Sequence, residues 1–456
     1  MKFFRKSFLN VPLTMTNNPV NKFLDIVTGN RKGTAKGIYS ICSVNREVLE
    51  ACFQQAKEDD SLILIESTSN QVDQYGGYTG MYPDDFVGFV HSISARQNFP
   101  EEKILLGGDH LGPNRWRNLP SEKAMEQAAM LIEAYVKAGY QKIHLDASMF
   151  CADDAGDRSK FLSNEIVAAR TLKLCKVAED TWKKSISQKP GLIYIIGTDV
   201  PPPGGAKSKE DAIQLTKTKD VALTLEAAKR SFIEAGLTDA WERVAGLVVQ
   251  PGVEFGDDQV SYYQREKVKS LSNKIMEHDH LVFEVHSTDY QSESVLKALV
   301  EDHFCILKVG PWLTFAFREA LFALEAIESE LLGKKNIELS LLSYTLDKAM
   351  VSTPDHWKAY YTGDENEKSF KRKFSFSDRA RYYWHLPELE KAKSRLFNNL
   401  SHVKIPLSLL SQYMPAQFYM ADKKIKSDPR DLLISHIRTI ASIYARACGL
   451  SKYDTR

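Results

Sequence analysis

The stretch KILLGGDHLGP, residues 103–113, is one of eight short apolar runs whose recurrence predicts the fold. Most runs contain four to six residues rich in Ile, Val and Leu, as expected for strands that are buried on both faces. The runs cover residues 37–45, 61–70, 103–113, 142–149, 192–201, 245–255, 281–290 and 304–311. Segments with helical spacing of apolar residues lie between them, and this alternation implies parallel strands joined by helical crossovers.

Eight strand–helix units over roughly 290 residues match the count and size of a (β/α)8 barrel. An open, doubly wound sheet is the alternative, since periodicity alone cannot show closure. That alternative lacks support, because no GxGxxG motif follows the first run. We therefore expect an α/β fold, a (β/α)8 TIM barrel with an N-terminal helical lead-in over residues 1–328.

The pattern changes after the eighth run. Residues 329–456 contain helix-like runs and polar loops, with apolar spacing of three and four in 339–351 and 429–449. We expect a helical C-terminal extension packed on the barrel. Between these runs lies an aromatic and basic segment, and the alternative is that its Arg379, Arg381 and Tyr382 reach the active site or a subunit interface.

Composition excludes several classes of function. The chain has 456 residues, 43% hydrophobic and 26% charged, with a net charge of +1, so no global field attracts nucleic acid or an anionic membrane. Its six cysteines form no CxxC pair, which favours reduced thiols and argues against a zinc–thiolate site. No run of about 18 apolar residues occurs. We predict a cytoplasmic protein with neither nucleic acid nor membrane as a partner.

Catalytic groups of such barrels gather where strands end and the following loops begin. All eight runs carry polar or ionisable residues near that end. Each one alone could cap a helix or form a turn. Burying so many carboxylates together is costly without a cation, however, so their convergence on one barrel mouth predicts a metal site.

His110 and His286 are the natural metal ligands, because neutral imidazoles on rigid strand ends suit Zn²⁺, our first choice, or Mn²⁺. The candidate oxygen donors are Asp199, Asp146 and Glu254, and of these we assign Asp199 to the metal. The alternative for each histidine is a neutral ring that is hydrogen-bonded in its loop. His144 alternates with apolar neighbours inside its run, so we expect it to point into packing.

Asp109, beside a predicted ligand, is our candidate general acid/base, and Glu254 is the second catalytic candidate. Neighbouring side chains on a strand point apart, so Asp109 and His110 can share a site only where the strand curls. Gly107, Gly108 and Gly112 permit such a bend.

The polar mouth predicts a sugar or sugar-phosphate substrate. The loop HSTDYQ, residues 286–291, offers hydroxyls and backbone amides before a helix, a setting that can hold a phosphate. The candidate substrate-binding residues are Glu66, Asn70, Gln71, Asp146, Gln250, Ser287 and Asp289.

Several motifs carry a specific resemblance. The segments IESTSNQVDQYGGYTGM, LGGDHLGPNRW, KIHLDASM, GTDVPPPGG, VVQPGVEF, HSTDYQ, LKVGPWLTFAFREALFALEAIE, DRARYYW and PLSLLSQYMPAQF resemble the Z-type subunit of class II tagatose-1,6-bisphosphate aldolases. The resemblance runs in order from about residue 25 to the C terminus. It implies a fold similar to that of metal-dependent class II fructose-bisphosphate aldolases. Their Asp–His pair, proton donor and metal ligand, corresponds to Asp109 and His110, and a later histidine ligand to His286.

The resemblance implies two functions in ketohexose metabolism. The Z subunit is described as a stabilising companion of a Y-type aldolase subunit, whereas relatives are metal-dependent 4-epimerases of tagatose, fructose or their 6-phosphates. Two residues depart from the family pattern: Asp199 replaces the glutamate of GTEVP, and Trp312 replaces the alanine of KVGPA. A sugar-binding barrel without chemistry is the third hypothesis. We expect an oligomer, with a Y-type subunit as a possible partner.

Overall fold

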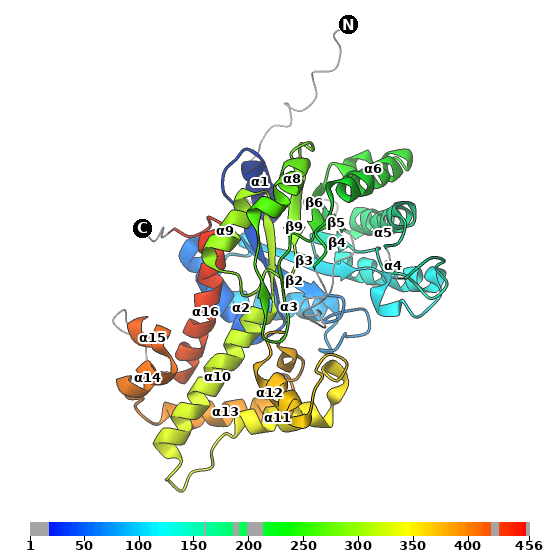
Figure 1. The fold of residues 1–456 in the computed structure, drawn as a ribbon. Coiled ribbons are helices and arrows are strands. Elements are labelled where there is room, and N and C mark those ends of the chain that lie inside the picture. Colours follow the sequence, from blue (N-terminus) through cyan, green and yellow to red (C-terminus); the bar gives the residue numbers. More distant parts are fainter. Residues whose placement is uncertain (1–17, 159–160, 186–190, 198–212, 421–427, 453–456) are drawn as a thin grey trace.

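In the computed structural model, eight parallel strands close into a barrel (Figure 1). The structure describes residues 18–158, 161–185, 191–197, 213–420 and 428–452. The strands are β1 (Ile38–Cys42), β2 (Ile63–Thr68), β3 (Ile104–Leu111), β4 (Lys142–Leu145), β5 (Ile193–Gly197), β6 (Val244–Val249), β9 (Val282–Val285) and β10 (Ile306–Val309). Each predicted apolar run overlaps one of them, and seven of the eight runs contain the whole strand. Every one of the eight strands pairs with two neighbours, and β1 pairs with the last strand, β10, so the sheet closes and the open-sheet alternative is excluded.

Helices surround the barrel, most of them in the connections between successive strands, and the last of them follows β10. They are α2 (Arg46–Asp59), α3 (Pro83–Arg96), α4 (Ser121–Ala138), α5 (Asn164–Ser185), α6 (Thr218–Glu234), α7 (Thr238–Trp241), α8 (Arg265–Ile275), α9 (Glu293–Glu301) and α10 (Pro311–Leu332). The periodic apolar residues of α4, among them Ala128, Leu131 and Ile132, are fully buried. Their spacing of three and four places them on one face of the helix, which is the face that packs on the sheet.

The sixth run ends earlier than the sequence suggested. Strand β6 stops at Val249, and a turn through Pro251 and Gly252 (φ +95°) leads into a separate antiparallel pair, β7 (Glu254–Phe255) and β8 (Val260–Ser261). Proline has no N–H to donate to a strand ladder, which favours this interruption. Glu254 therefore lies on the small hairpin rather than at the end of a barrel strand.

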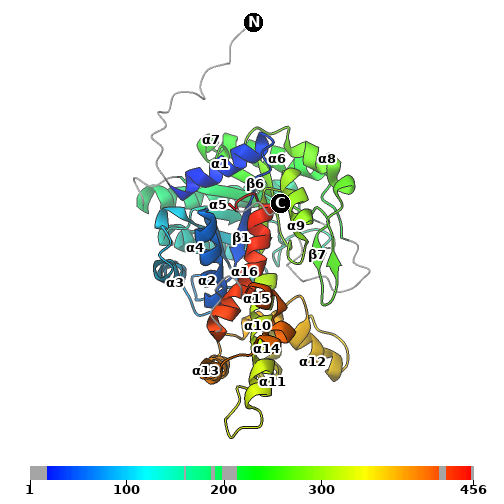
Figure 2. The ribbon, with the colours of Figure 1, turned by 90° about the vertical axis from the view of Figure 1, so that its left-hand side faces the viewer.

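The amino end of the barrel is covered by α1 (Pro19–Arg31), which lies across it at the end opposite α11 (Leu342–Ser352) and α13 (Pro387–Ser401) (Figure 2). Val20, Phe23 and Val27 of this helix are buried in a cluster with residues from the starts of the strands, including Ile38 and Leu62. This apolar plug seals the lower barrel, so the polar interior opens toward the carboxyl ends of the strands.

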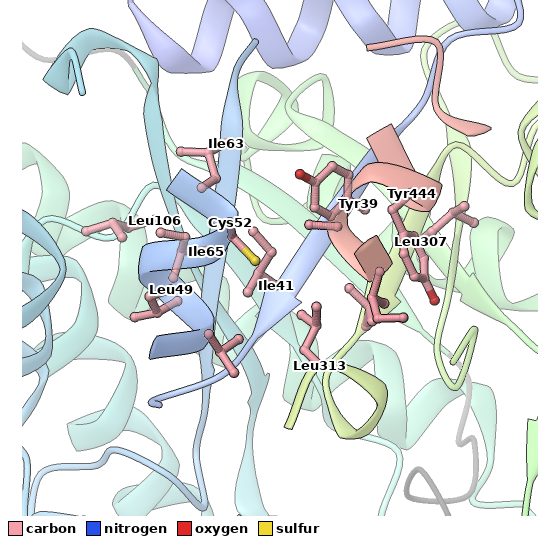
Figure 3. Packing of buried hydrophobic residues seen from close by; sticks show 14 of the residues in the cluster. Tyr39, Ile41, Leu49, Cys52, Ile63, Ile65, Leu106, Leu307, Leu313 and Tyr444 are labelled. Carbon is pink, nitrogen blue, oxygen red and sulfur yellow. The ribbon is translucent and has the colours of Figure 1, made fainter. Parts of the chain in front are cut away.

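The outer face of the barrel and the last helix of the chain pack together in one hydrophobic core. Figure 3 shows Tyr39 and Ile41 of β1 next to Cys52 of α2, with Tyr444 on the other side. Tyr444 belongs to the last helix, α16 (Pro429–Ala447), and its ring centroid lies 5.7 Å from that of Tyr39. The final helix thus packs on the first strand of the barrel.

The extension contains α11 (Leu342–Ser352), α12 (Glu365–Phe374), α13 (Pro387–Ser401), α14 (Leu407–Tyr413) and α15 (Pro415–Met420) before α16. It touches loops at the carboxyl ends of the strands. The ring of Tyr78, after β2, lies 4.8 Å from that of Tyr382, and Tyr290, after β9, donates to the carbonyl of Phe376. Arg381 and Tyr382 therefore lie near the barrel mouth.

Among the described helices, none is long and apolar enough to cross a membrane.

Candidate metal centre and active site

The end of β3 bends, as the sequence suggested it must. The pairing of β3 with β4 shifts in register between Gly108 and Leu111, and His110 has a left-handed φ of +52°. A side chain at Gly112 would place its Cβ 1.5 Å from the carbonyl oxygen of Asp146, so that position requires glycine. The bulge breaks the usual alternation, because an extra residue reorients the side chains around it. As a result, Asp109 and His110 both contact groups on β4.

Four buried side chains from three strands gather around one point. Asp109 on β3, His144 on β4, and Glu284 and His286 from β9 and its end each offer a ligand atom, and these atoms all lie within 4.8 Å of one another. Nδ1 of His286 is buried without a hydrogen-bond partner in the described part of the chain. Two imidazoles and two carboxylates form a donor set that suits Zn²⁺ or Mn²⁺, and the unpartnered ring nitrogen of His286 is available as a ligand. The residues therefore fit a divalent metal.

His110 lies beside this group. Its ring centroid is 4.9 Å from that of His286 and 5.2 Å from that of His144. Its Nδ1 lies 2.9 Å from Oδ2 of Asp146, whose other oxygen accepts a hydrogen bond from Ser148. A histidine that binds metal usually has its second ring nitrogen on a carboxylate in this way.

The protonation of the two predicted imidazole ligands differs in the metal-free protein. Burial alone would lower the pKa of His110, but the carboxylates of Asp109 and Asp146 raise it to about 9. Burial lowers the pKa of His286 to about 4, so this ring is neutral at pH 7. Burial would raise the pKa of Asp109, but the charges of His110 and Lys308 hold it well below its usual range. Asp109 is therefore ionised.

A layer of buried charges lies within the barrel beside the metal group. Nζ of Lys142 is 2.5 Å from Oε1 of Glu66 and 2.6 Å from Oε2 of Glu284, and all three side chains are fully buried. Lys308 pairs with Glu66, and its Nζ lies 2.7 Å from Oδ1 of Asp109. Burial would lower the pKa of both lysines, but the carboxylates raise it. Both ammonium groups thus stay charged.

The charges of this group match one divalent cation. Glu66, Asp109, Asp146 and Glu284 are carboxylates, whereas only Lys142 and Lys308 supply permanent positive charge. The proton that the raised pKa gives His110 offsets one of the two remaining negative charges, and if His110 loses this proton to bind a metal, both charges are without compensation. Because uncompensated buried charge is strongly unfavourable, a doubly charged metal is the ion that this set accommodates best.

Glu254 and Gln250 make local contacts instead of joining the metal group. Oε1 of Glu254 accepts a hydrogen bond from the amide of Phe255 on its own hairpin. Oε1 of Gln250 accepts from the amide of Gly252, 2.8 Å away, and so shapes the turn after β6. Both side chains are buried. The substrate-binding role of Gln250 and the catalytic role of Glu254 both stay predictions.

The predicted binding residues on β2 and in the loop after it lie in different surroundings. Glu66 lies in the barrel interior with the two lysines, whereas Asn70 is exposed. Gln71 is buried, accepts from the amide of Thr68 and donates to the carbonyl of Cys42, which ties the loop to β1. Asp199, predicted as a metal ligand, lies outside the described residues.

The loop after β9 is bound to its own neighbours. Ser287 is buried with a left-handed φ of +55°. Oδ1 of Asp289 accepts hydrogen bonds from the amides of Gly310 and Trp312, which follow β10. Asp289 therefore joins the loop after β9 to the loop after β10, and the substrate-binding roles of Ser287 and Asp289 stay predictions.

Sequence reasoning missed His144 and Lys142. We expected His144 to point into packing, but its Nδ1 lies 2.8 Å from Oδ1 of Asp109 inside the barrel. The signal was present, since Lys142, His144 and Asp146 alternate with Ile143 and Leu145. In a barrel strand with period two, one face points outward to the helices and the other inward, so the polar face had to be the inner one.

Fold and site together define a (β/α)8 barrel with a candidate divalent-metal centre at the carboxyl ends of its strands. The family description D-tagatose-1,6-bisphosphate aldolase subunit GatZ/KbaZ-like matches residues 23–449. The chain belongs to this family, which confirms the resemblance drawn from the motifs.

One solved structure is similar over nearly the whole chain. It is described as a probable tagatose 6 phosphate kinase from Sinorhizobium meliloti 1021, with 40% identity and a TM-score of 0.82 over 91% of this chain and 100% of that one. The YdjI aldolase from Escherichia coli K12 aligns at 14% identity and a TM-score of 0.39, over 84% of this chain and 97% of that one. Similarity as low as the second supports no inference about activity.

Proposed function

We propose that the chain is a metal-dependent enzyme that cleaves and re-forms the C3–C4 bond of a ketohexose, as an aldolase component or as a 4-epimerase. The observation that carries the proposal is the buried set of Asp109, His144, Glu284 and His286, with donor atoms within 4.8 Å. Burying these groups costs stability that well-packed apolar residues would not cost. Buried ionisable groups with shifted pKa values are typical of functional sites.

The proposed ligands include His286 and His110, with His144 as a further imidazole and Asp199 as the ligand predicted from sequence. A bound divalent cation would polarise the sugar carbonyl and stabilise the negative charge that develops when the C3–C4 bond breaks. Zn²⁺ is our first choice and Mn²⁺ the second.

Asp109 performs the proton transfer in this proposal. Its carboxylate is ionised and held by Lys308, so it can accept the proton of the C4 hydroxyl as the C3–C4 bond breaks. In an aldolase the resulting aldehyde leaves. In a 4-epimerase it rotates and the bond re-forms on its other face, so inversion at C4 requires no redox cofactor.

The test begins with the purified protein alone. Its metal content is measured, and it is incubated with tagatose, fructose and their phosphates while products are followed by NMR. We expect turnover, and Asp109→Asn should lower it about 10²- to 10⁴-fold while the protein keeps its fold and metal. Activity of Asp109→Asn equal to that of the wild type would remove Asp109 from the mechanism.

Two further variants separate metal binding by His286 from the predicted catalytic role of Glu254. His286→Gln should lose metal, because it removes a proposed ligand. Glu254→Gln makes the same carboxylate-to-amide change on β7 and tests the second catalytic candidate. If Glu254→Gln leaves turnover unchanged, its predicted catalytic role is wrong, whereas the metal centre remains supported.

A second candidate function follows from the family description as an aldolase subunit. In that case the wild-type protein is inactive alone but raises the activity of a Y-type aldolase subunit. If Asp109→Asn raises that activity equally well, the chain acts as a companion and the catalytic proposal is overturned.

A further inference from the structure

Arg381 lies at the mouth of the barrel, on the short helix η4 (Arg379–Tyr382) of the C-terminal extension. The ring centroid of its neighbour Tyr382 is 4.8 Å from that of Tyr78, in the loop after β2. Burial raises the pKa of Asp289, in the loop after β9, and the charge of Arg381 is among the interactions that oppose this rise. In the closed sheet, β2 and β9 flank β1 and β10. The η4 segment therefore interacts with loops from both sides of this part of the mouth.

The loop after β2 connects this position to the metal centre. Gln71 is hydrogen-bonded to Tyr78 and donates to the carbonyl of Cys42, at the end of β1. Sγ of Cys42 in turn lies within 4.8 Å of a carboxylate oxygen of Asp109. Arg381 is thus linked to the centre through these side chains and does not belong to the metal group. A phosphate on a terminal carbon of a ketohexose is likewise several bonds away from the C3–C4 bond, so its binding residue is expected near the metal group but outside it.

The guanidinium of Arg381 contacts only neutral oxygens. Its Nη1 donates to the carbonyls of Ser377 and Asp378, and its Nη2 donates to the hydroxyl of Tyr382, 3.1 Å away. A guanidinium has five N–H donors, so Nε and one proton of Nη2 have no acceptor in the described part of the chain. The Tyr382 hydroxyl accepts from Arg381 and keeps its own proton for donation. Its ring is stacked on that of His356, with centroids 4.7 Å apart, so these donors are held in place before a ligand binds.

The positive charge of Arg381 has no contact counter-ion. The nearby carboxylate of Asp378 accepts from the Thr314 hydroxyl, and its Oδ1 lies 3.6 Å from Nε of Arg318. Asp289 accepts from two backbone amides. Among the residues that the structure describes, no carboxylate is within ion-pair distance of the half-buried Arg381 guanidinium. Such a charge is costly without an anion, and paired N–H donors of arginine suit the oxygens of a phosphate.

We propose that Arg381 and Tyr382 bind the phosphate of a phosphorylated ketohexose, so that the C-terminal extension supplies part of the substrate site of the barrel. The inference rests on the proposed function for the chemistry at C3–C4 and adds the residues that recognise the phosphate. The remaining N–H donors of Arg381 and the hydroxyl of Tyr382 hydrogen-bond phosphate oxygens, and the guanidinium supplies the counter-charge.

Phosphate affinity of Arg381→Gln is the direct test. The full-length wild type and variant, with the metal that each carries as isolated, are titrated by calorimetry with fructose and tagatose, their 6-phosphates, and inorganic phosphate. The variant should bind the 6-phosphates and inorganic phosphate about 10- to 100-fold more weakly, as expected for lost hydrogen bonds to a charged group, and the free sugars as tightly as the wild type. Equal losses for phosphorylated and free sugars would mean that Arg381 only supports the shape of the mouth, and would overturn the inference.

Three further variants isolate the donors from the fold. Arg381→Lys keeps the charge without the paired N–H groups and should recover part of the lost phosphate affinity. Tyr382→Phe keeps the stacked ring and removes only the hydroxyl, so it should weaken phosphate binding by a smaller factor. Arg379→Gln is the matched control, because its guanidinium donates to the carbonyl of His356 and lies over the ring of Tyr360. If Arg379→Gln loses as much phosphate affinity as Arg381→Gln, the assignment to Arg381 is overturned. Should Arg381→Gln fail to fold, Arg381→Lys and Tyr382→Phe provide the same comparison of phosphorylated with free sugars.

The inference and the proposed function fail separately. If phosphate binds through Arg381 but no sugar is turned over, the chemistry at C3–C4 is wrong and the phosphate site stands. If sugars are turned over but the wild type binds 6-phosphates no more tightly than free sugars, the phosphate site is wrong and the proposed function stands.

Discussion

The variant Lys308→Met tests whether the ammonium group of Lys308 supplies part of the positive charge that a bound divalent metal would otherwise supply. Nζ of Lys308 pairs with Glu66 and lies 2.7 Å from Oδ1 of Asp109 and 3.6 Å from Oε1 of Glu284, and its side chain is 5% exposed. Methionine fills a similar volume, so the change removes charge with little loss of packing. Removing one partner of a buried ion pair costs about 3–5 kcal/mol.

The expected shift in melting temperature follows from the size of the chain. Unfolding entropy of about 2.1 cal/mol/K per residue gives roughly 1 kcal/mol/K for this chain, so the metal-free variant should melt about 3–5 °C lower. A divalent cation bound by the histidines next to Asp109 and Glu284 would replace the lost charge, so saturating Mn²⁺ or Zn²⁺ should recover most of this loss.

Metal affinity should rise in Lys308→Met, although the stability of the metal-free variant falls. Two unit charges about 4 Å apart at an effective dielectric constant of 20 interact by about 4 kcal/mol, so loss of the competing ammonium should tighten metal binding by at least about tenfold, or ~1.4 kcal/mol. Scanning calorimetry of chelator-treated and metal-loaded protein measures the stability, and competition with a chromogenic chelator measures the affinity.

The control is Lys137→Met, the same replacement at an exposed pair with Glu133, which should cost less than about 1 kcal/mol with or without metal. The reasoning is refuted if Lys308→Met loses the same stability in both states and binds metal no more tightly than the wild type.

Three further predictions concern stability. Burial raises the pKa of Asp289 to about 6, so its protonated carboxyl stabilises the fold at low pH and this contribution is lost as pH rises through 6. Asp289→Asn should therefore be more stable than the wild type by about 1–3 kcal/mol at pH 8 and equal to it in stability below about pH 4. Denaturation measured as a function of pH tests this. Gly112→Ala would place its Cβ 1.5 Å from the carbonyl oxygen of Asp146, so it should lower the free energy of unfolding by at least about 2–3 kcal/mol, measured by urea denaturation. The control is Gly88→Ala on α3, whose Cβ would meet nothing within 4 Å and which should leave stability unchanged or raise it. A chain of residues 1–328 should aggregate, because it lacks α16 on the face of β1; soluble protein with unchanged melting would show that the barrel is independent of the extension.

Local patterns in the sequence determined the elements of the barrel. The eight apolar runs and the helical spacing between them depend on which faces a strand or helix must bury, and that is a property of neighbouring residues. The same reasoning placed Asp109, His110 and His286 at strand ends and required a bend after Gly107 and Gly108. Parallel strands put their carboxyl ends at one rim, so the general location of the site followed as well.

Only the tertiary structure decided which of these groups meet. Lys308 pairs with Glu66 across 242 positions of the chain, and closure of β1 on β10 is what brings them together. The inward face of β4 added His144 to the predicted site, and the turn after β6 carried Glu254 onto a hairpin. Asp289 joins the loops after β9 and β10 only because Gly310 and Trp312 lie beside it. Such contacts depend on distances between strands remote in sequence, which local periodicity does not encode.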